Sequence, residues 1–369
     1  MPAAEANQTE DNAPIRVMVV DDSAVVRGFI VRILESQPGI DVVVTCGNGQ
    51  MAVQHASRTP LDVVILDVEM PVMDGLTAVP RLLAVNPHLR IVMASTLTQR
   101  NAGVSLEALQ RGATDYIPKP TTSGISTNTD FRRELVEKVL ALGRSTAQFI
   151  APPAARPKPR PAQKAPAVKL RNAAPSRPKA LVIGSSTGGP QALLALLAAL
   201  PRELIAPVLI AQHMPATFTA ILAQHIARAS GRPCAEAANG APLRPGSIYL
   251  APGDFHMEVV RDGTNHIARL SQSAAENFCR PSVDPLFRSA ARLYGSDVCA
   301  VMLTGMGSDG LDGTRQLAAC GAPVIAQDEA TSVVWGMPGA IAAAGLCTAV
   351  LPLKDIAGHL ASLFCGGRR

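Results

Sequence analysis

The feature that most constrains the fold is an alternation of short apolar runs with amphipathic segments, which occurs twice along the chain. Runs such as IRVMVV and VVILDV in the first half, and ALVIGSS and VCAVMLTG in the second, are typical of strands. Strands that are apolar throughout and alternate with helical patterns predict a parallel sheet covered on both faces. We therefore expect two doubly wound α/β domains, over residues 15–142 and 180–369.

A proline-rich segment separates the two alternating regions. Residues 151–179 hold eight of the 30 prolines, eight of the 34 basic residues and no acidic residue. Proline-rich sequence of a single charge sign stays extended and solvated, so residues 143–179 are predicted to be a linker. The remaining 26 basic residues are outnumbered by 29 acidic ones, so residues 151–179 account for the positive net charge of the chain.

Composition excludes several other classes of protein. Aromatic residues make up 3% of the chain, too few for stacking single-stranded nucleic acid. The seven cysteines form no C-x-x-C pair, and we expect them to be reduced thiols of a cytoplasmic protein. The polar, acidic N-terminus is not a signal peptide, and no apolar run is long enough to span a membrane. We expect neither nucleic-acid binding nor membrane insertion.

Polar residues follow the predicted strands of the first domain. Asp21 and Asp22 come directly after VMVV, Asp67 ends VVILD, Ser95 follows IVMA and Lys119 follows DYIP. Parallel sheets place their ligand sites at these carboxyl ends. Three carboxylates together would repel one another unless a cation such as Mg²⁺ binds them, and a lysine and a hydroxyl could stabilise a phosphoryl group. Either Asp21 or Asp22 alone could equally be a helix cap.

The segments VDDS, LDVEMPVMDG, MAST and YIPKP make residues 15–142 resemble the receiver domains of bacterial response regulators, which are flavodoxin-like. The resemblance implies that a histidine kinase phosphorylates Asp67. It also implies that Asp21 and Asp22 bind Mg²⁺ with Asp67, and that Ser95 and Lys119 contact the phosphoryl group.

The second domain contains a nucleophile motif. Gly184–Gly188 reads G-S-S-T-G and fits G-x-S-x-G, directly after the strand ALVI and before the helical run PQALLALL. That context places Ser186 on a sharp strand-to-helix turn, where a serine nucleophile is exposed. A phosphate-binding turn would instead need G-x-G-x-x-G, which is absent. A glycine-rich turn with purely structural serines is the remaining alternative.

A serine nucleophile needs a base and an acid that orients it. His213 closes the apolar run PVLIAQ and Asp309 follows VCAVML, so both should lie at the same sheet edge as Ser186. Asp312 is an alternative acid, although it is more easily explained as part of a helix start. His256 is an alternative base, and pocket lining is its simpler role.

Six segments of the second half together resemble the catalytic domain of the chemotaxis protein-glutamate methylesterase (CheB) family: IGSSTGGP, AQHMP, APGDFHM, RPSVD, MLTGMGSDG and AQDEATSVVWGMP. The resemblance implies a Rossmann-like serine esterase with Ser186 as nucleophile, His213 as base and Asp309 as orienting acid, and no cofactor. Backbone near Met306 would stabilise the oxyanion. The chain departs from the family pattern at Ser185, Ser308 and Cys279, where alanine, asparagine and histidine are usual.

The resemblance implies a function in chemosensory adaptation. The enzyme would hydrolyse glutamate γ-methyl esters on the cytoplasmic helices of methyl-accepting chemoreceptors and deamidate certain glutamines, after phosphorylation of Asp67 relieves inhibition. Two other classes remain open: a response regulator with a DNA-binding output, for which the second half shows no basic recognition helix, and a phosphorylation-dependent scaffold with an inactive hydrolase domain.

Overall fold

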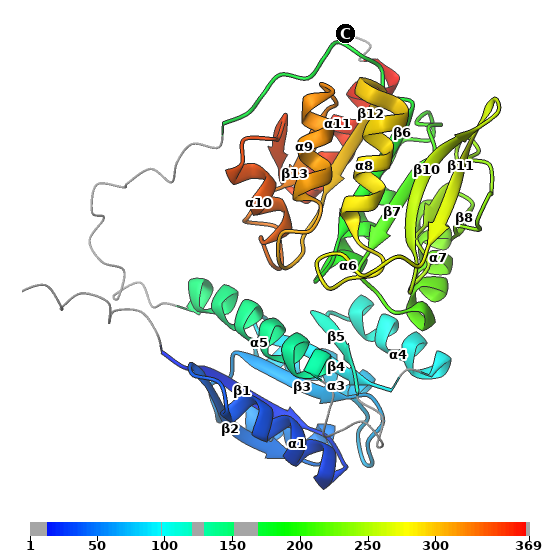
Figure 1. Ribbon diagram of the computed structural model, residues 1–369. Helices are drawn as coiled ribbons and strands as arrows, with labels where there is room; N and C mark the ends of the chain where they lie inside the picture. Colours follow the sequence, from blue (N-terminus) through cyan, green and yellow to red (C-terminus); the bar gives the residue numbers. More distant parts are fainter. Residues whose placement is uncertain (1–12, 97, 120–128, 151–168, 367–369) are drawn as a thin grey trace, which may run out of the picture. The chain divides into compact units, whose positions relative to one another are not determined.

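The computed structural model describes residues 13–96, 98–119, 129–150 and 169–366 (Figure 1). This part of the chain divides into two compact units, each built on its own parallel sheet. The expected pair of parallel α/β domains is confirmed. No helix of the described residues has the length and apolar character needed to cross a membrane.

The first unit has the strand order β2-β1-β3-β4-β5, with every pair parallel. This is the flavodoxin-like order, in which the ligand site lies beside the first and third strands. Helices α1 and α5 share one face, where the rings of Phe29 and Phe131 stack at 6.0 Å, and α2 packs with α3. Along residues 13–150 the elements are β1 (Ile15–Val20), α1 (Ala24–Glu35), β2 (Ile40–Cys46), α2 (Gly49–Ala56), β3 (Val63–Asp67), α3 (Gly75–Val85), β4 (Arg90–Ser95), α4 (Gln99–Gln110), β5 (Asp115–Pro118) and α5 (Thr129–Ile150). Of these, α4 is grouped with the second compact unit.

The second unit has a seven-stranded parallel sheet in the order β14-β13-β12-β6-β7-β9-β8. From β6 the chain steps outward through β7 toward β8 and β9, then returns to place β12 on the other side of β6. Such a reversal leaves a crevice at the carboxyl ends of the two central strands. The strands are β6 (Ala180–Ser185), β7 (Val208–Gln212), β8 (Cys234–Glu236), β9 (Ile248–Leu250), β12 (Val298–Met302), β13 (Val324–Gln327) and β14 (Ala349–Leu351).

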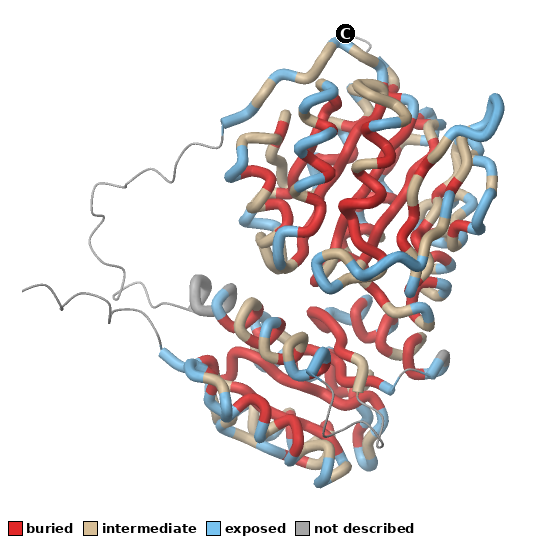
Figure 2. Tube along the Cα trace, viewed as in Figure 1, coloured by how far each residue is buried: buried red, intermediate tan, exposed pale blue. Residues whose placement is uncertain are grey.

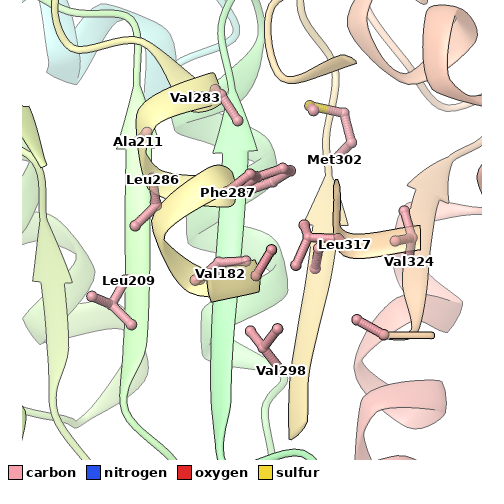
Figure 3. Close-up of a cluster of buried hydrophobic side chains, with 14 of the residues drawn as sticks. Val182, Leu209, Ala211, Val283, Leu286, Phe287, Val298, Met302, Leu317 and Val324 are labelled. Atoms are coloured by element: carbon pink, nitrogen blue, oxygen red, sulfur yellow. The ribbon is translucent and has the colours of Figure 1, made fainter. Parts of the chain in front are cut away.

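Helices cover both faces of this second sheet, and its central strands β6, β7, β12 and β13 are buried along their whole length (Figure 2). On the face covered by α8, α9 and α10, Leu286 and Phe287 of α8 pack on Val182 and Leu209 (Figure 3). An antiparallel hairpin, β10 (His256–Asp262) with β11 (Asn265–Ser271), also packs against α8. The helices are α6 (Gly189–Ala198), α7 (Ala216–Ser230), α8 (Val283–Tyr294), α9 (Leu311–Ala319), α10 (Met337–Ala343) and α11 (Leu353–Cys365), and a short 3₁₀ turn spans Gly295–Asp297.

The described parts of the predicted linker are ordered at both ends. Helix α5 continues to Ile150, eight residues beyond the expected boundary at residue 142. Residues 169–179 pack on the second unit: the N–H of Arg171 donates to Cys347 O at 2.9 Å, and Arg177 Nε donates to Phe364 O at 2.6 Å. The middle of the predicted linker, residues 151–168, lies outside the described residues. Ordered structure therefore extends past both expected boundaries, beyond residue 142 on one side and before residue 180 on the other.

Candidate active site and phosphorylation site

The receiver residues expected from the sequence meet at one edge of the first sheet. Lys119 Nζ lies 2.6 Å from Asp21 Oδ2 and 2.7 Å from Asp67 Oδ1, so the lysine neutralises part of the acidic cluster. The backbone N–H of Val68 donates to Asp67 Oδ1 at 2.7 Å. Ser95 ends β4 and is fully buried, and its hydroxyl donates to Thr96 O at 3.2 Å.

The charge balance of this cluster fits a divalent cation. Carboxylate oxygens of Asp21, Asp22 and Asp67 lie within 4.8 Å of one another. Burial raises the pKa of Asp67 to about 6; the positive charge of Lys119 opposes this shift, and Asp21 adds to it. One lysine against three carboxylates leaves a net negative charge, and oxygen ligands are those that Mg²⁺ prefers. The residues present therefore fit the cation implied for receiver domains.

Gly75 allows the chain to pass close to Asp67. A Cβ atom at position 75 would lie 2.1 Å from Asp67 O, so any other residue would push the loop away from the aspartate. The adjacent Asp74 caps α3 by accepting from the N–H of Thr77 at 2.7 Å. The segment after β3 is thereby held against the end of the strand that carries Asp67.

In the second unit, Ser186 and Ser185 occupy different environments. Ser185 is fully buried, and its hydroxyl donates to Gln212 Oε1 at 2.7 Å, whereas Ser186 is partly exposed. The backbone of Ser186 is fixed because its N–H donates to Thr304 O at 3.1 Å. Of the two serines in the motif, only Ser186 is therefore available to a substrate.

Gln212, the last residue of β7, joins the two strand ends that carry Ser186 and His213. Its Nε2 donates to Ser186 O at 3.0 Å and to His213 O at 3.1 Å, and its side chain is buried. A Cβ atom at Gly189 would lie 2.1 Å from Gln212 Oε1, so glycine is needed there. The sequence analysis did not identify this residue, because only the fold brings its amide between the two loops.

His213 and Asp309 form a buried pair. The Nε2 atom of His213 lies 2.7 Å from Asp309 Oδ2. Burial disfavours the charged imidazole, but Cys279 and Asp309 outweigh it and raise the pKa of His213. Burial likewise opposes ionisation of Asp309, but hydrogen bonds and the charge of His213 hold the pKa of this carboxyl well below its usual range. The surroundings therefore favour a protonated, positively charged imidazole next to an ionised carboxylate.

The N-terminus of α8 holds the Asp309 carboxylate in place. The N–H of Val283 donates to Oδ2 at 2.6 Å, and the hydroxyl of Ser282 donates to Oδ1 at 2.7 Å. Asn277 Nδ2 also donates to Oδ1, at 2.8 Å. Free N–H groups at a helix start favour a carboxylate there. The sequence analysis quoted RPSVD only for its family resemblance and did not predict this role.

The two alternative residues have other partners. His256 is buried, its Nδ1 accepts from the N–H of Ser282 at 3.2 Å, and its Nε2 lies 3.1 Å from Ala274 O. Both ring nitrogens are thus occupied by backbone groups. Asp312 lies in the first turn of α9 and pairs with Arg315 at 2.6 Å on the surface. Neither residue is placed to act on Ser186.

The loop after β12 approaches the nucleophile closely. A Cβ atom at Gly305 would lie 3.0 Å from Ser186 Cβ and 2.4 Å from Met337 Sδ, so only glycine fits. Within the described residues, the N–H groups of Thr187 and Met306 make no hydrogen bond. Backbone donors without a partner, in loops next to a partly exposed serine, are the kind of group that can stabilise an oxyanion.

The fold and these sites define a response regulator whose output domain is an α/β hydrolytic enzyme. Known proteins agree with this class. A family model described as CheB methylesterase matches residues 181–360, and one described as response regulator receiver domain matches residues 17–125.

Curated relatives match nearly the whole chain. A protein of Rhodospirillum rubrum named protein-glutamate methylesterase/protein-glutamine glutaminase 1 is 55% identical, over 97% of each chain. A protein of Azospirillum brasilense with the same name but no number is 50% identical, over 97% of this chain and 95% of its own. The crystal structure of the Thermotoga maritima CheB methylesterase catalytic domain is 40% identical, with a TM-score of 0.49, and covers 50% of this chain and 98% of that one. The chain belongs to the CheB family of protein-glutamate methylesterase/protein-glutamine glutaminases, as its motifs predicted.

Proposed function

We propose that this protein is a chemotaxis methylesterase and glutaminase in which Ser186, His213 and Asp309 form the catalytic triad and phosphorylation of Asp67 controls the rate. The observation that carries the triad is the 2.7 Å bond between His213 Nε2 and Asp309 Oδ2, at the sheet edge that exposes Ser186. The substrates are methylated glutamates, and certain glutamines, on the cytoplasmic helices of methyl-accepting chemoreceptors. A chemotaxis histidine kinase is the phosphodonor, and the enzyme works in the cytoplasm.

The contacts of His213 support a different role for each of its ring nitrogens in this proposal. Because Nε2 donates to Asp309, Nδ1 is the atom that accepts the proton of Ser186. Ser186 Oγ attacks the ester carbonyl carbon, and the resulting oxyanion accepts hydrogen bonds from the N–H groups of Thr187 and Met306. The intermediate then collapses with cleavage of the bond between the carbonyl carbon and the methoxy oxygen, and this oxygen takes the proton from Nδ1 and leaves as methanol. Water hydrolyses the acyl-enzyme by the same steps, and a glutamine side chain releases ammonia instead.

In the receiver, Asp67 is the acceptor because its carboxylate lies beside the cation of Lys119. Asp21, Asp22 and Asp67 would hold Mg²⁺, which would neutralise charge on the phosphoryl group. Lys119 and the hydroxyl of Ser95 would contact the phosphoryl oxygens. The hydroxyl of Ser95 now donates a long, weak hydrogen bond of 3.2 Å to Thr96 O. On phosphorylation it would donate to a phosphoryl oxygen instead.

The test of the triad is methanol release from methylated receptor membranes. Ser186→Ala should lower the rate by roughly three orders of magnitude or more, because no other hydroxyl is exposed in the motif. Ser185→Ala, the matched control, should retain most activity, since it loses only its bond to Gln212. Near-normal turnover by Ser186→Ala would disprove the assignment.

The choice of base is tested in the same assay. His213→Ala should lose almost as much activity as Ser186→Ala, because members of a triad act as a unit. His256→Ala should lose less, since both nitrogens of His256 bond to the backbone. The opposite result would make His256 the base.

A further inference from the structure

One nitrogen of the proposed base already has a partner. Cys279 Sγ lies 3.3 Å from His213 Nδ1, within hydrogen-bond distance for sulfur. No hydrogen bond joins Ser186 Oγ to His213 in the described part of the chain. The nitrogen that must take the proton of Ser186 is therefore in contact with a thiol in the resting enzyme.

The turn that carries Cys279 is strongly constrained. Glu276 and Cys279 exchange two backbone hydrogen bonds, of 3.2 and 2.9 Å, and the two residues between them have left-handed backbone angles, with φ of 52° at Asn277 and 62° at Phe278. A two-residue turn of this kind favours Asn and Gly, so Phe278 is strained. Phe278 is also 78% exposed, although it is a large apolar residue.

Three side-chain hydrogen bonds hold this turn in place. Arg288 makes two hydrogen bonds to the carboxylate of Glu276, of 2.8 and 2.7 Å. Asn277 Nδ2 donates to Asp309 Oδ1, so the turn is tied directly to the orienting acid. Backbone strain persists only where the surroundings impose it, and it is concentrated at functional sites. The strained turn thus presents Asn277 to the acid and Cys279 to the base.

We propose that Cys279 is a positioning residue that occupies the base nitrogen of His213 in the resting enzyme and sets the pH range in which Ser186 is activated. A neutral thiol donates its proton to Nδ1, and a thiolate accepts the proton of an imidazolium. In both forms the sulfur competes with Ser186 for the same nitrogen. This inference rests on the proposed triad.

The groups facing the His213 ring determine the direction of the effect. Asp309 contacts Nε2 and Cys279 contacts Nδ1. The buried carboxyl of Asp284 interacts in turn with Asp309 and accepts a hydrogen bond from Asn277 Nδ2. Negative charge on Cys279 or Asp309 favours the imidazolium, which cannot act as a base. Replacing the thiol removes one of these contributions and lowers the pKa of His213. The neutral imidazole then persists to lower pH, so the acidic limb of the activity profile moves to lower pH.

The experiment is the pH profile of kcat/KM for methanol release by the full-length protein. Cys279→Ala should shift the acidic limb downward by about one unit, which makes the variant about tenfold faster than the original on that limb. Cys279→Ser should shift it similarly, because a hydroxyl keeps a hydrogen bond but carries no charge at these pH values. Profiles identical to that of the original protein in both variants would overturn the proposal.

A second measurement does not depend on the pH profile. Iodoacetamide should inactivate the original protein, because a carbamidomethyl group on Cys279 would fill the space before Nδ1. Under iodoacetamide, the activity of Cys279→Ser should have a half-life at least tenfold longer than that of the original protein. The control variant Cys320→Ala removes an exposed thiol at the end of α9 and should lose activity as fast as the original protein. Equal inactivation of Cys279→Ser and the original protein would contradict the contact.

The two hypotheses fail separately. If Ser186→Ala keeps its activity, the triad is wrong whatever Cys279 does. If Ser186→Ala is inactive while the Cys279 variants keep the original pH profile and iodoacetamide sensitivity, only the role of Cys279 is wrong.

Discussion

At the scale of single residues, the sequence identified the groups that stand at strand ends. Ser186, His213 and Asp309 each follow an apolar run, and the structure brings His213 and Asp309 to 2.7 Å. Cys279 and Gln212 were not predicted as neighbours of the base. Cys279 is 66 residues from His213 in the sequence, and no periodic pattern encodes a contact made between two loops. Residues on regular elements can be placed from sequence, whereas loop contacts depend on the fold.

Asp67 permits a prediction about stability and pH. Its pKa is raised from 3.8 to about 6, chiefly by burial, so the folded receiver binds this proton more tightly than the unfolded chain does. This contribution to stability is fully present below about pH 4 and is lost as the pH rises through 6. At pH 7 without Mg²⁺, Asp67→Asn should therefore stabilise the receiver by about 1–2 kcal/mol.

Calorimetry of the full-length protein checks the Asp67 prediction, because the receiver transition is the one that Mg²⁺ shifts. Saturating Mg²⁺ should raise the transition temperature of the original protein more than that of Asp67→Asn. If Asp67→Asn without Mg²⁺ has the same transition temperature as the original protein, or a lower one, then the buried carboxylate of Asp67 does not destabilise the folded receiver.

At the scale of elements, the alternation of apolar and amphipathic segments predicted the strands and helices, whereas the linker was placed from composition alone. Proline and basic residues suggested a solvated spacer up to residue 179, yet the described residues 169–179 contact the second unit through backbone and guanidinium groups. Arg171 Nε donates to Leu346 O at 2.8 Å, and Lys179 Nζ pairs with Asp297 at 2.6 Å. Arginine and proline occur both in free linkers and in extended segments that pack on a domain, so composition alone could not separate the two.

This segment yields a prediction for two fragments of the esterase. A fragment starting at Ala154 retains residues 169–179, whereas one starting at Ala180 loses several hydrogen bonds, each contributing about 1 kcal/mol. The shorter fragment should be less stable by about 2–4 kcal/mol. Urea unfolding followed by the fluorescence of Trp335, the only tryptophan, measures the difference. Equal midpoints and slopes would mean that the segment contributes nothing.

At the scale of the whole molecule, one chain combines a phosphate acceptor with a hydrolase, and the family assignment covers both. A ligand or modification shifts an equilibrium only through differential affinity for two states. If Asp67 is phosphorylated as proposed, the modification must therefore change an interaction on which the esterase depends. The motifs revealed both domains, but they contain no information on how the domains communicate.

The coupling can be measured with a small phosphodonor and Mg²⁺. Methanol release by the full-length protein should increase on addition of the phosphodonor. Asp67→Asn should remain at the basal rate, and the fragment starting at Ala154 should exceed that rate and ignore the phosphodonor. If Asp67→Asn still responds, another residue is the acceptor. If the fragment is no faster than the unphosphorylated chain, the receiver does not restrain the esterase.

The left-handed turn at Glu276–Cys279 also has a consequence for protein engineering. Asn277 tolerates this backbone conformation, but at Phe278 the conformation costs about 1–3 kcal/mol of folding free energy. Screening for heat resistance would therefore favour glycine at position 278. The relaxed turn would hold Cys279 less firmly against His213. A variant with glycine at position 278 would therefore be more resistant to heat and would also be active over a different pH range. Thermal tolerance and pH optimum are linked here through one exposed phenylalanine.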